Sequence, residues 1–168
     1  NAAKRIEFQR NSLAQVFDKM NYNDWIIYSD SDEIPNLTNI NFNKINKKFL
    51  LFRQDMFYYK FNLCLQRLDW YGSKACQYKN LTTISELRNI KPKKYGWWRF
   101  DTMFKRNKFI NLKVITDGGW HFTEIKTPEE IYIKHSNDEH HDEFDRTGIN
   151  EENIRDMIKN RYIPYDHN

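Results

Sequence analysis

The segment that decides the fold reads WIIYSDSDEIP and spans residues 25–35. Its first four residues form a continuous apolar run, which is short enough for a buried β-strand. An acidic cluster follows directly, and Pro35 then opposes simple continuation because proline has no amide hydrogen to donate. The pattern predicts a strand over residues 25–28 that delivers carboxylates to one end of a sheet.

The acidic cluster places Asp30 and Asp32 two residues apart. In an extended chain such side chains point the same way, and neighbouring carboxylates repel each other unless a cation lies between them. Oxygen ligands suit hard divalent ions such as Mg²⁺ or Mn²⁺, which also accept water and substrate phosphates. One interpretation is therefore a metal site at the carboxyl end of a strand, where α/β proteins bind ligands. The other is an Asp-rich turn that caps the next segment.

The rest of the chain mixes helical and extended patterns. Apolar periodicity and capping residues predict helices over residues 2–20, 85–90 and 150–159 and a helix start at residues 127–130, with the helix over 85–90 capped by Thr82 or Thr83. Apolar and aromatic runs predict strands over residues 49–52, 56–61, 68–71 and 111–116. We therefore expect an α/β fold in which a central mixed sheet is flanked by helices, as a single domain over residues 1–168.

Composition narrows the function classes. The formal charge of +4 favours an anionic ligand slightly and does not by itself indicate nucleic acid. The twelve Phe, ten Tyr and five Trp residues can build a core or platforms for ring-shaped ligands, but they lack the spacing of an RNA-recognition motif. No apolar run approaches the roughly 20 residues that span a bilayer. Cys64 and Cys76 lack metal-ligand spacing, so two free thiols are expected, with one disulfide as the alternative.

Residues 24–35 resemble the hydrophobic strand and D-x-DEIP signature of glycosyltransferase family 17, which includes the bisecting β-1,4-N-acetylglucosaminyltransferase of N-glycan synthesis. Gly119-Trp120-His121 is similar to the family's GWH element, and residues 127–134 resemble the T-P-E-x-I-Y-x-K helix that follows it. Residues 145–158 resemble its charged downstream segment. These pieces occur in the family's order, and the resemblance covers the chain from about Arg10 to Ile158.

The resemblance implies a GT-A-type fold, inversion at the anomeric carbon, a UDP-sugar donor (UDP-N-acetylglucosamine in the characterised branch), a glycan or glycoprotein acceptor, and Mn²⁺ or Mg²⁺. The metal ligands would be Asp30, Asp32 and His121. The donor would contact the same three residues together with Trp120 and Arg99. The family's nucleotide-binding strands upstream of the first helix are largely missing from this chain. We therefore expect a fragment or minimal form without the amino-terminal βαβ portion.

Several of these residues have a second interpretation. His121 can complete a carboxylate site or can be a half-buried histidine that bonds the backbone, and Trp120 can lie beneath a sugar or in the core. Arg99 can contact a diphosphate, or it can belong to an amphipathic strand with outward cations, the reading that residues 97–106 favour on their own. Residues 135–143 are rich in histidine and acids, yet they match no zinc helix or calcium loop, so a solvated loop is expected.

Inverting transfer needs a general base that takes the proton of the acceptor hydroxyl. Glu33, Asp117 and Glu124 all belong to candidate site segments, and spacing alone does not separate them. Glu33 has two alternatives: contact with donor hydroxyls, or fixing of the loop through backbone amides.

Three functions remain open from the sequence. The first is a metal-dependent glycosyltransferase, and the second is a carbohydrate- or nucleotide-binding module that has lost catalysis. An RNA-binding domain ranks well below both, so we expect no nucleic-acid partner. The compartment is open as well: the cytoplasm for a microbial or viral protein, the Golgi lumen for a processed eukaryotic one.

Overall fold

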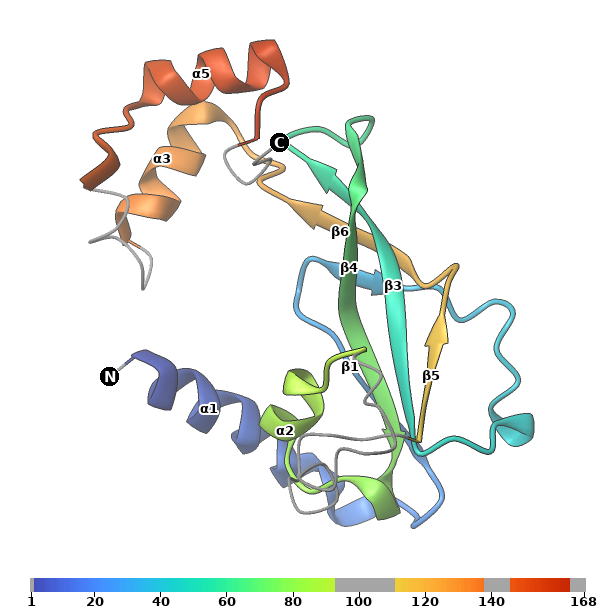
Figure 1. Cartoon of the computed structure of the whole chain (residues 1–168). Coiled ribbons are helices and arrows are strands. Elements are labelled where there is room, and N and C mark those ends of the chain that lie inside the picture. The colour runs from blue at the N-terminus through green and yellow to red at the C-terminus, as the bar shows by residue number, and fades with distance from the viewer. Residues whose placement is uncertain (1, 93–110, 138–145, 164–168) are drawn as a thin grey trace, which may run out of the picture. The chain divides into compact units, whose positions relative to one another are not determined.

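The computed structural model describes residues 2–92, 111–137 and 146–163, which have a mixed α/β architecture with one mixed sheet and several helices (Figure 1). The chain divides into two compact units. Unit 1 contains Asn1–Asp55 and Leu68–His121, and unit 2 contains Met56–Arg67 and Phe122–Asn168. Strands β3, β4 and β6 each contribute residues to both units. The expectation of an α/β fold is confirmed at this level.

The sheet has six strands in the order β1-β4-β3-β6-β2, with β5 paired to β3. Pairing is antiparallel between β1 and β4 and between β2 and β6, whereas β3 and β5 are parallel. The strands are β1 Trp25–Tyr28, β2 Glu33–Pro35, β3 Phe49–Tyr58, β4 Cys64–Gln77, β5 Leu112–Ile115 and β6 Gly119–Thr123. The strand predicted over residues 25–28 is confirmed, while β2 and β6 were not predicted.

The helices are α1 Ala2–Ser12, α2 Ile84–Asn89, α3 Pro128–Asn137 and α5 Glu151–Asn160, with 3₁₀ segments Leu13–Lys19, Phe42–Lys44 and Tyr78–Asn80. The predicted first helix is α-helical only as far as Ser12 and continues as 3₁₀. Thr83 is the cap of α2, because its hydroxyl accepts a hydrogen bond from the Glu86 amide at 3.1 Å. No helix in the described ranges is long and apolar enough to cross a bilayer.

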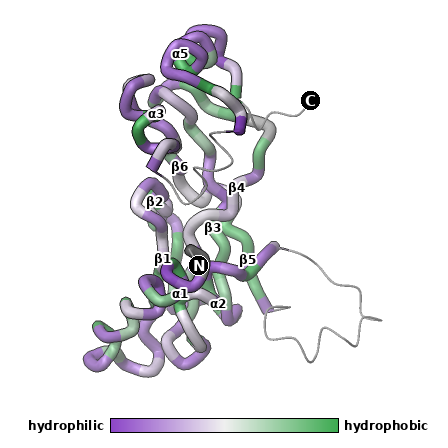
Figure 2. Tube along the Cα trace, turned by 90° about the vertical axis from the view of Figure 1, so that its left-hand side faces the viewer, coloured by the Kyte–Doolittle hydropathy of each residue, from purple (hydrophilic) through white to green (hydrophobic). Residues whose placement is uncertain are grey.

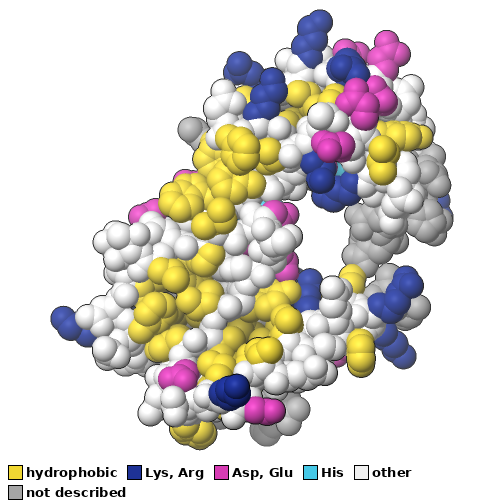
Figure 3. Space-filling model, turned by 180° about the vertical axis from the view of Figure 1, so that it is seen from behind, with side chains coloured by type: hydrophobic (Ala, Val, Ile, Leu, Met, Phe, Trp, Pro, Cys, Tyr) yellow, Lys and Arg dark blue, Asp and Glu magenta, His cyan; other side chains and the backbone are white. Residues whose placement is uncertain are grey.

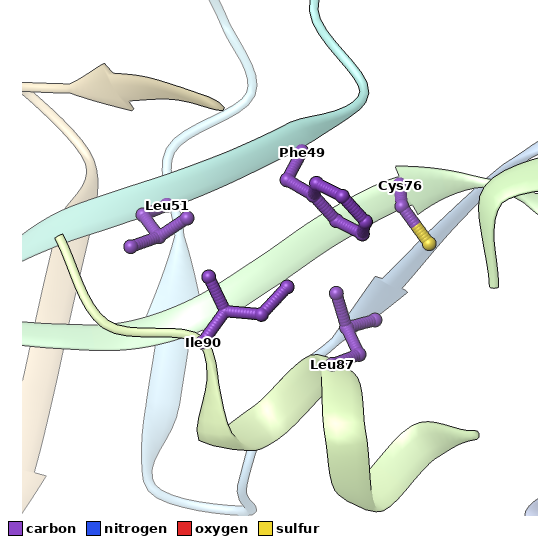
Figure 4. Packing of buried hydrophobic residues seen from close by; sticks show 5 residues of the cluster. All are labelled: Phe49, Leu51, Cys76, Leu87 and Ile90. Atoms are coloured by element: carbon purple, nitrogen blue, oxygen red, sulfur yellow. The ribbon is translucent and has the colours of Figure 1, made fainter. Parts of the chain in front are cut away.

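The core of unit 1 lies on both faces of the sheet. On one face, Leu87 and Ile90 of the α2 region point toward Phe49 and Leu51 of β3 and Cys76 of β4 (Figure 4). Burial raises the pKa of the Cys76 thiol to about 12, whereas Cys64 is exposed, and both cysteines are free thiols.

On the opposite face, the segment after β2 covers the sheet. Its apolar residues Ile40, Phe42 and Ile45 pack against a buried set that comprises Leu50, Phe52 and Ala75. Residues 36–48 thus stand where a second helix would be expected in a layered α/β fold, and β5 borders them through Ile115.

Unit 2 contains α3 and α5, along which most residues are hydrophilic and a few are hydrophobic (Figure 2). Ile131 and Ile154 are the buried residues of these two helices. Thr127 and Glu130 exchange backbone–side-chain hydrogen bonds at the start of α3, as the Thr-Pro-Glu-Glu sequence predicts. Arg155 then donates to Glu129 of α3 at 2.7 Å and to Glu151 at 2.8 Å.

Candidate functional site

The two most distinctive segments of the sequence form a pair of adjacent strands. Glu33 lies opposite His121, Ile34 opposite Trp120, and Pro35 opposite Gly119. Proline is tolerated in β2 because this strand lies at the end of the sheet order. Gly119 has φ +109°, and a β-carbon there would lie 2.0 Å from the Ile34 carbonyl oxygen, so only glycine fits.

Glu33 is the buried centre of the site, with a side chain that is 1% exposed. One carboxylate oxygen accepts from Trp70 Nε1 at 3.0 Å and from Arg88 Nη2 at 3.1 Å. The other accepts from the Asp30 amide at 3.2 Å, so the prediction that Glu33 fixes the loop through a backbone amide is confirmed. A general base must reach the acceptor hydroxyl, and to do so Glu33 would have to leave these hydrogen bonds.

Asp30 faces Arg88. Its carboxylate accepts from Arg88 Nη2 at 2.6 Å and from the Tyr28 hydroxyl at 2.7 Å. Burial, and then the hydrogen bond to Asp30, raise the pKa of Tyr28. Arg88 also donates to the Gly72 carbonyl at 3.0 Å, and its guanidinium carbon lies 6.0 Å from the Trp70 ring centroid. The positive charge that neutralises the Asp30 and Glu33 carboxylates is thus that of the Arg88 side chain.

Two residues of β4, Gly72 and Lys74, adjoin Glu33 and the Arg88 backbone. A β-carbon on Gly72 would lie 2.5 Å from Glu33 Cδ and 2.1 Å from Gln54 Oε1, so glycine makes room for the buried carboxylate. Lys74 is 5% exposed, and its ammonium donates to the carbonyls of Arg88 and of Ile90, the latter at 2.6 Å. Burial, followed by the Arg88 charge, lowers the pKa of Lys74 to about 8.

Asp32 and His121 form the accessible part of the site. His121 Nε2 lies 3.4 Å from Asp32 Oδ2; the imidazole is 8% exposed and the carboxylate 43%. The His121 ring packs against Trp70, with 4.6 Å between ring centroids. Nδ1 is buried without a hydrogen-bond partner among the described residues. Nε2 is therefore the nitrogen that faces the carboxylate.

The predicted metal set is brought together only in part. Asp32 and His121 lie together, with 3.4 Å between Oδ2 and Nε2, whereas Asp30 is held by Arg88. Within the described ranges, no group of three or more His, Cys, Asp or Glu side chains could hold a metal ion. A divalent ion that takes most of its ligands from water and a diphosphate needs only one or two protein ligands. The residues present therefore fit such an ion at Asp32 and His121.

The other predicted site residues that the structure describes have surroundings of their own. Trp120 is 41% exposed, which rules out a core position, and β-strand alternation points it away from the face of His121. Asp117 is exposed and accepts from Asn36 Nδ2 at 3.1 Å. Glu124 belongs to unit 2, where its buried carboxylate binds Lys134 Nζ at 2.7 Å and lies 3.5 Å from His135 Nε2. Arg99, like residues 138–143, lies outside the described residues.

Four residues that support the acidic cluster were not predicted from the sequence: Trp70, Gly72, Lys74 and Arg88. Gly72 carried a usable signal, because a glycine inside a strand often marks a close approach of another group. Arg88 carried none, since a basic residue near the end of a short helix is ordinary.

No family model, no curated protein and no solved structure matches this chain. A function must therefore be inferred from the chemistry and geometry of the site, together with the resemblance of its two motifs.

Proposed function

We propose that this protein is a metal-dependent, inverting glycosyltransferase of the GT-A type that uses a UDP-sugar, most simply UDP-N-acetylglucosamine, and a glycan or glycoprotein acceptor. The observation that carries the proposal is the Asp32–His121 pair, 3.4 Å apart and open to solvent on the Asp32 side. The mixed α/β sheet, with carboxylates at the end of β1, supports the same assignment.

Each residue has a defined task in this proposal. Asp32 and His121 would hold Mn²⁺ or Mg²⁺, which when bound supplies positive charge to the leaving diphosphate. Arg88 neutralises Asp30 and Glu33, which fixes the turn that carries Asp32. Trp70 packs on the His121 ring and donates to Glu33, so it orients the imidazole. The general base in this proposal is one of Glu33, Asp117 and Glu124, the three candidates that the sequence offers.

A second function is favoured by one specific observation. Arg88 already neutralises Asp30 and Glu33 without any metal, as expected of a carbohydrate- or nucleotide-binding module without catalysis. Such a module would bind UDP or a sugar and would not release UDP from a UDP-sugar.

Calorimetric titration of UDP with and without Mn²⁺ tests the metal site. We expect binding that depends on Mn²⁺ and that Asp32→Ala and His121→Ala each weaken by at least about tenfold, or 1.4 kcal/mol. Asp18→Ala, an exposed aspartate of the same unit, is the matched control and should bind like the unaltered chain. Equal Mn²⁺-dependent affinity in Asp32→Ala would refute the site.

The two functions separate in a second measurement. UDP release from UDP-sugars in the presence of Mn²⁺ and a glycan acceptor would support the transferase. UDP binding with no release across UDP-N-acetylglucosamine, UDP-glucose and UDP-galactose would support the binding module.

A further inference from the structure

Strands β2 and β6 have a second face, opposite the one that carries Glu33 and His121. There Ile34 and Trp120 are paired across the strands and are 50% and 41% exposed. In unit 1, hydrophobic side chains reach the surface in patches between other side chains (Figure 3). An exposed tryptophan beside an exposed isoleucine offers a flat apolar platform to a ligand.

This platform continues into a cavity. The Asn36 amide donates to the Gly118 carbonyl at 3.0 Å, which extends the strand pairing past Pro35. Asn36 is two residues beyond Ile34, so it lies on the same face about 7 Å further along the strand. It lines a cavity of about 370 Å³, a volume within the range of about 300–1,000 Å³ for small-molecule sites.

The cavity is lined by both apolar side chains and side chains that form hydrogen bonds. The lining residues are of two kinds: the aliphatic residues Ile40, Ile45, Val114 and Ile115, and the polar or charged residues Asn36, Asn39, Asn41, Lys44, Lys113, Thr116 and Asp117. A hydrogen bond from Asn36 Nδ2 to Asp117 Oδ2 joins two of these polar side chains. The side chains of Lys44, Lys113 and Asn39 make no hydrogen bond or ion pair with other described residues.

These groups match a sugar better than a nucleobase or an aliphatic ligand. Each sugar hydroxyl donates and accepts, as do the asparagine amides and the threonine hydroxyl. The carbon–hydrogen face of a pyranose ring can pack on the isoleucine side chains of the cavity and on a tryptophan ring. No aromatic side chain lines the described walls of the cavity, so a base would find no stacking partner inside it.

We propose that Ile34, Trp120 and the cavity around Asn36 and Asp117 form a binding site for an oligosaccharide. One sugar ring stacks on Trp120, and a neighbouring ring of the same oligosaccharide occupies the cavity. The inference rests on the proposed function only where it identifies this oligosaccharide as the acceptor glycan.

The test is an NMR titration of the ¹⁵N-labelled full chain with chitotriose, mannotriose, cellotriose and lactose, each without nucleotide or metal. We expect at least one of them to shift the amide signals of residues 34–45 and 113–120. Trp120→Ala and Asn39→Ala should each weaken that binding by at least about fivefold, which corresponds to about 1 kcal/mol. Phe8→Ala, which removes another exposed aromatic ring of unit 1, and Asn46→Ala are the matched controls and should leave the affinity unchanged.

Two results would overturn the site: no shift of these amides with any of the four saccharides, or an affinity that Trp120→Ala leaves intact. The amide spectrum of each variant shows whether it is folded. A parallel titration with UDP and Mn²⁺ keeps the inferences apart. Saccharide binding without UDP binding would contradict the proposed donor and leave this site standing. UDP binding without saccharide binding would contradict this site and leave the proposed donor standing.

Discussion

Glu33 and His121 lie opposite each other on the paired strands β2 and β6. Neither strand is longer than five residues, yet their pairing brings the acidic segment and the Gly-Trp-His segment together. The pairing sorts the side chains into two faces. Glu33 and His121 turn toward Trp70, and Ile34 and Trp120 turn toward solvent.

Arg88→Met should destabilise the chain strongly. The substitution leaves the Asp30 and Glu33 carboxylates without their cation, and Glu33 is almost completely buried. Removing one partner of a buried ion pair typically costs about 3–5 kcal/mol; Asp30 is 31% exposed, so we expect the lower end of that range. Urea unfolding followed by circular dichroism measures the change. Arg5→Met, an exposed arginine on α1, is the control, and an equal effect of both substitutions would contradict the assigned role.

Gly72→Ala should disturb Glu33 although it adds a single methyl group. The new carbon would lie 2.1 Å from Gln54 Oε1 and 2.5 Å from Glu33 Cδ, and both side chains are buried and hydrogen-bonded. Overpacking of this kind costs about 1–3 kcal/mol. We also expect altered fluorescence from Trp70, because its indole hydrogen bond to Glu33 must shift. Unchanged stability together with an unchanged emission spectrum would show that the carboxylate is not confined there.

The elements that were predicted correctly are those specified by local chemistry. The run from Trp25 to Tyr28 is apolar and short, and a Thr-Pro pair followed by acids, as at Thr127-Pro128, is typical of a helix start. The Thr83 cap likewise depends on neighbours three residues away. Such signals act over one turn of helix or one strand, so they can be read without knowledge of the fold.

The site residues depend on partners far along the chain. The β2–β6 ladder joins residues 33–35 to 119–121, and β2 has only three residues, too few for a periodic pattern. Arg88 reaches Asp30 only because α2 packs on the β3–β4 face through Leu87. The two-residue spacing of Asp30 and Asp32 suggested a shared ion, whereas in the folded chain their carboxylates have different partners, Arg88 and His121.

Lys74 should make stability depend on alkaline pH. Its pKa is about 8 in the folded chain, against 10.5 for an ordinary lysine. Below pH 8 both the folded and the unfolded chain bind the proton, so the cost of burying the charge is fully present. Between pH 8 and 10.5 the unfolded chain binds more protons at this residue, so stability rises with pH, by up to about 3 kcal/mol.

The measurement for Lys74 is urea unfolding below pH 8 and near pH 10.5, for the unaltered chain, Lys74→Met and Lys48→Met. The unaltered chain and Lys48→Met, an exposed control, should gain stability relative to Lys74→Met as the pH rises. If the free energy of unfolding changes with pH in the same way for the unaltered chain and Lys74→Met, then burial does not lower the pKa of this lysine.

Lys134→Met should destabilise unit 2 through Glu124. The Glu124 side chain is 4% exposed, its Oε1 binds Lys134 at 2.7 Å, and its Oε2 is buried without a hydrogen-bond partner among the described residues. The backbone of Glu124 has φ +54°, a conformation that costs a non-glycine residue free energy. Removal of the cation leaves the buried carboxylate with His135, at 3.5 Å, as its remaining ion-pair partner among the described residues.

We expect Lys134→Met to cost about 1–3 kcal/mol, less than for a fully buried pair because the lysine side chain is 43% exposed. Hydrogen exchange at the amides of α3 measures the effect within unit 2. Lys126→Met removes an exposed lysine close by and should leave that exchange unchanged. Adding Glu124→Gln to Lys134→Met should restore part of the loss, because a neutral amide needs no counter-charge; if the double variant exchanges as fast as Lys134→Met alone, the buried charge is not what the lysine compensates.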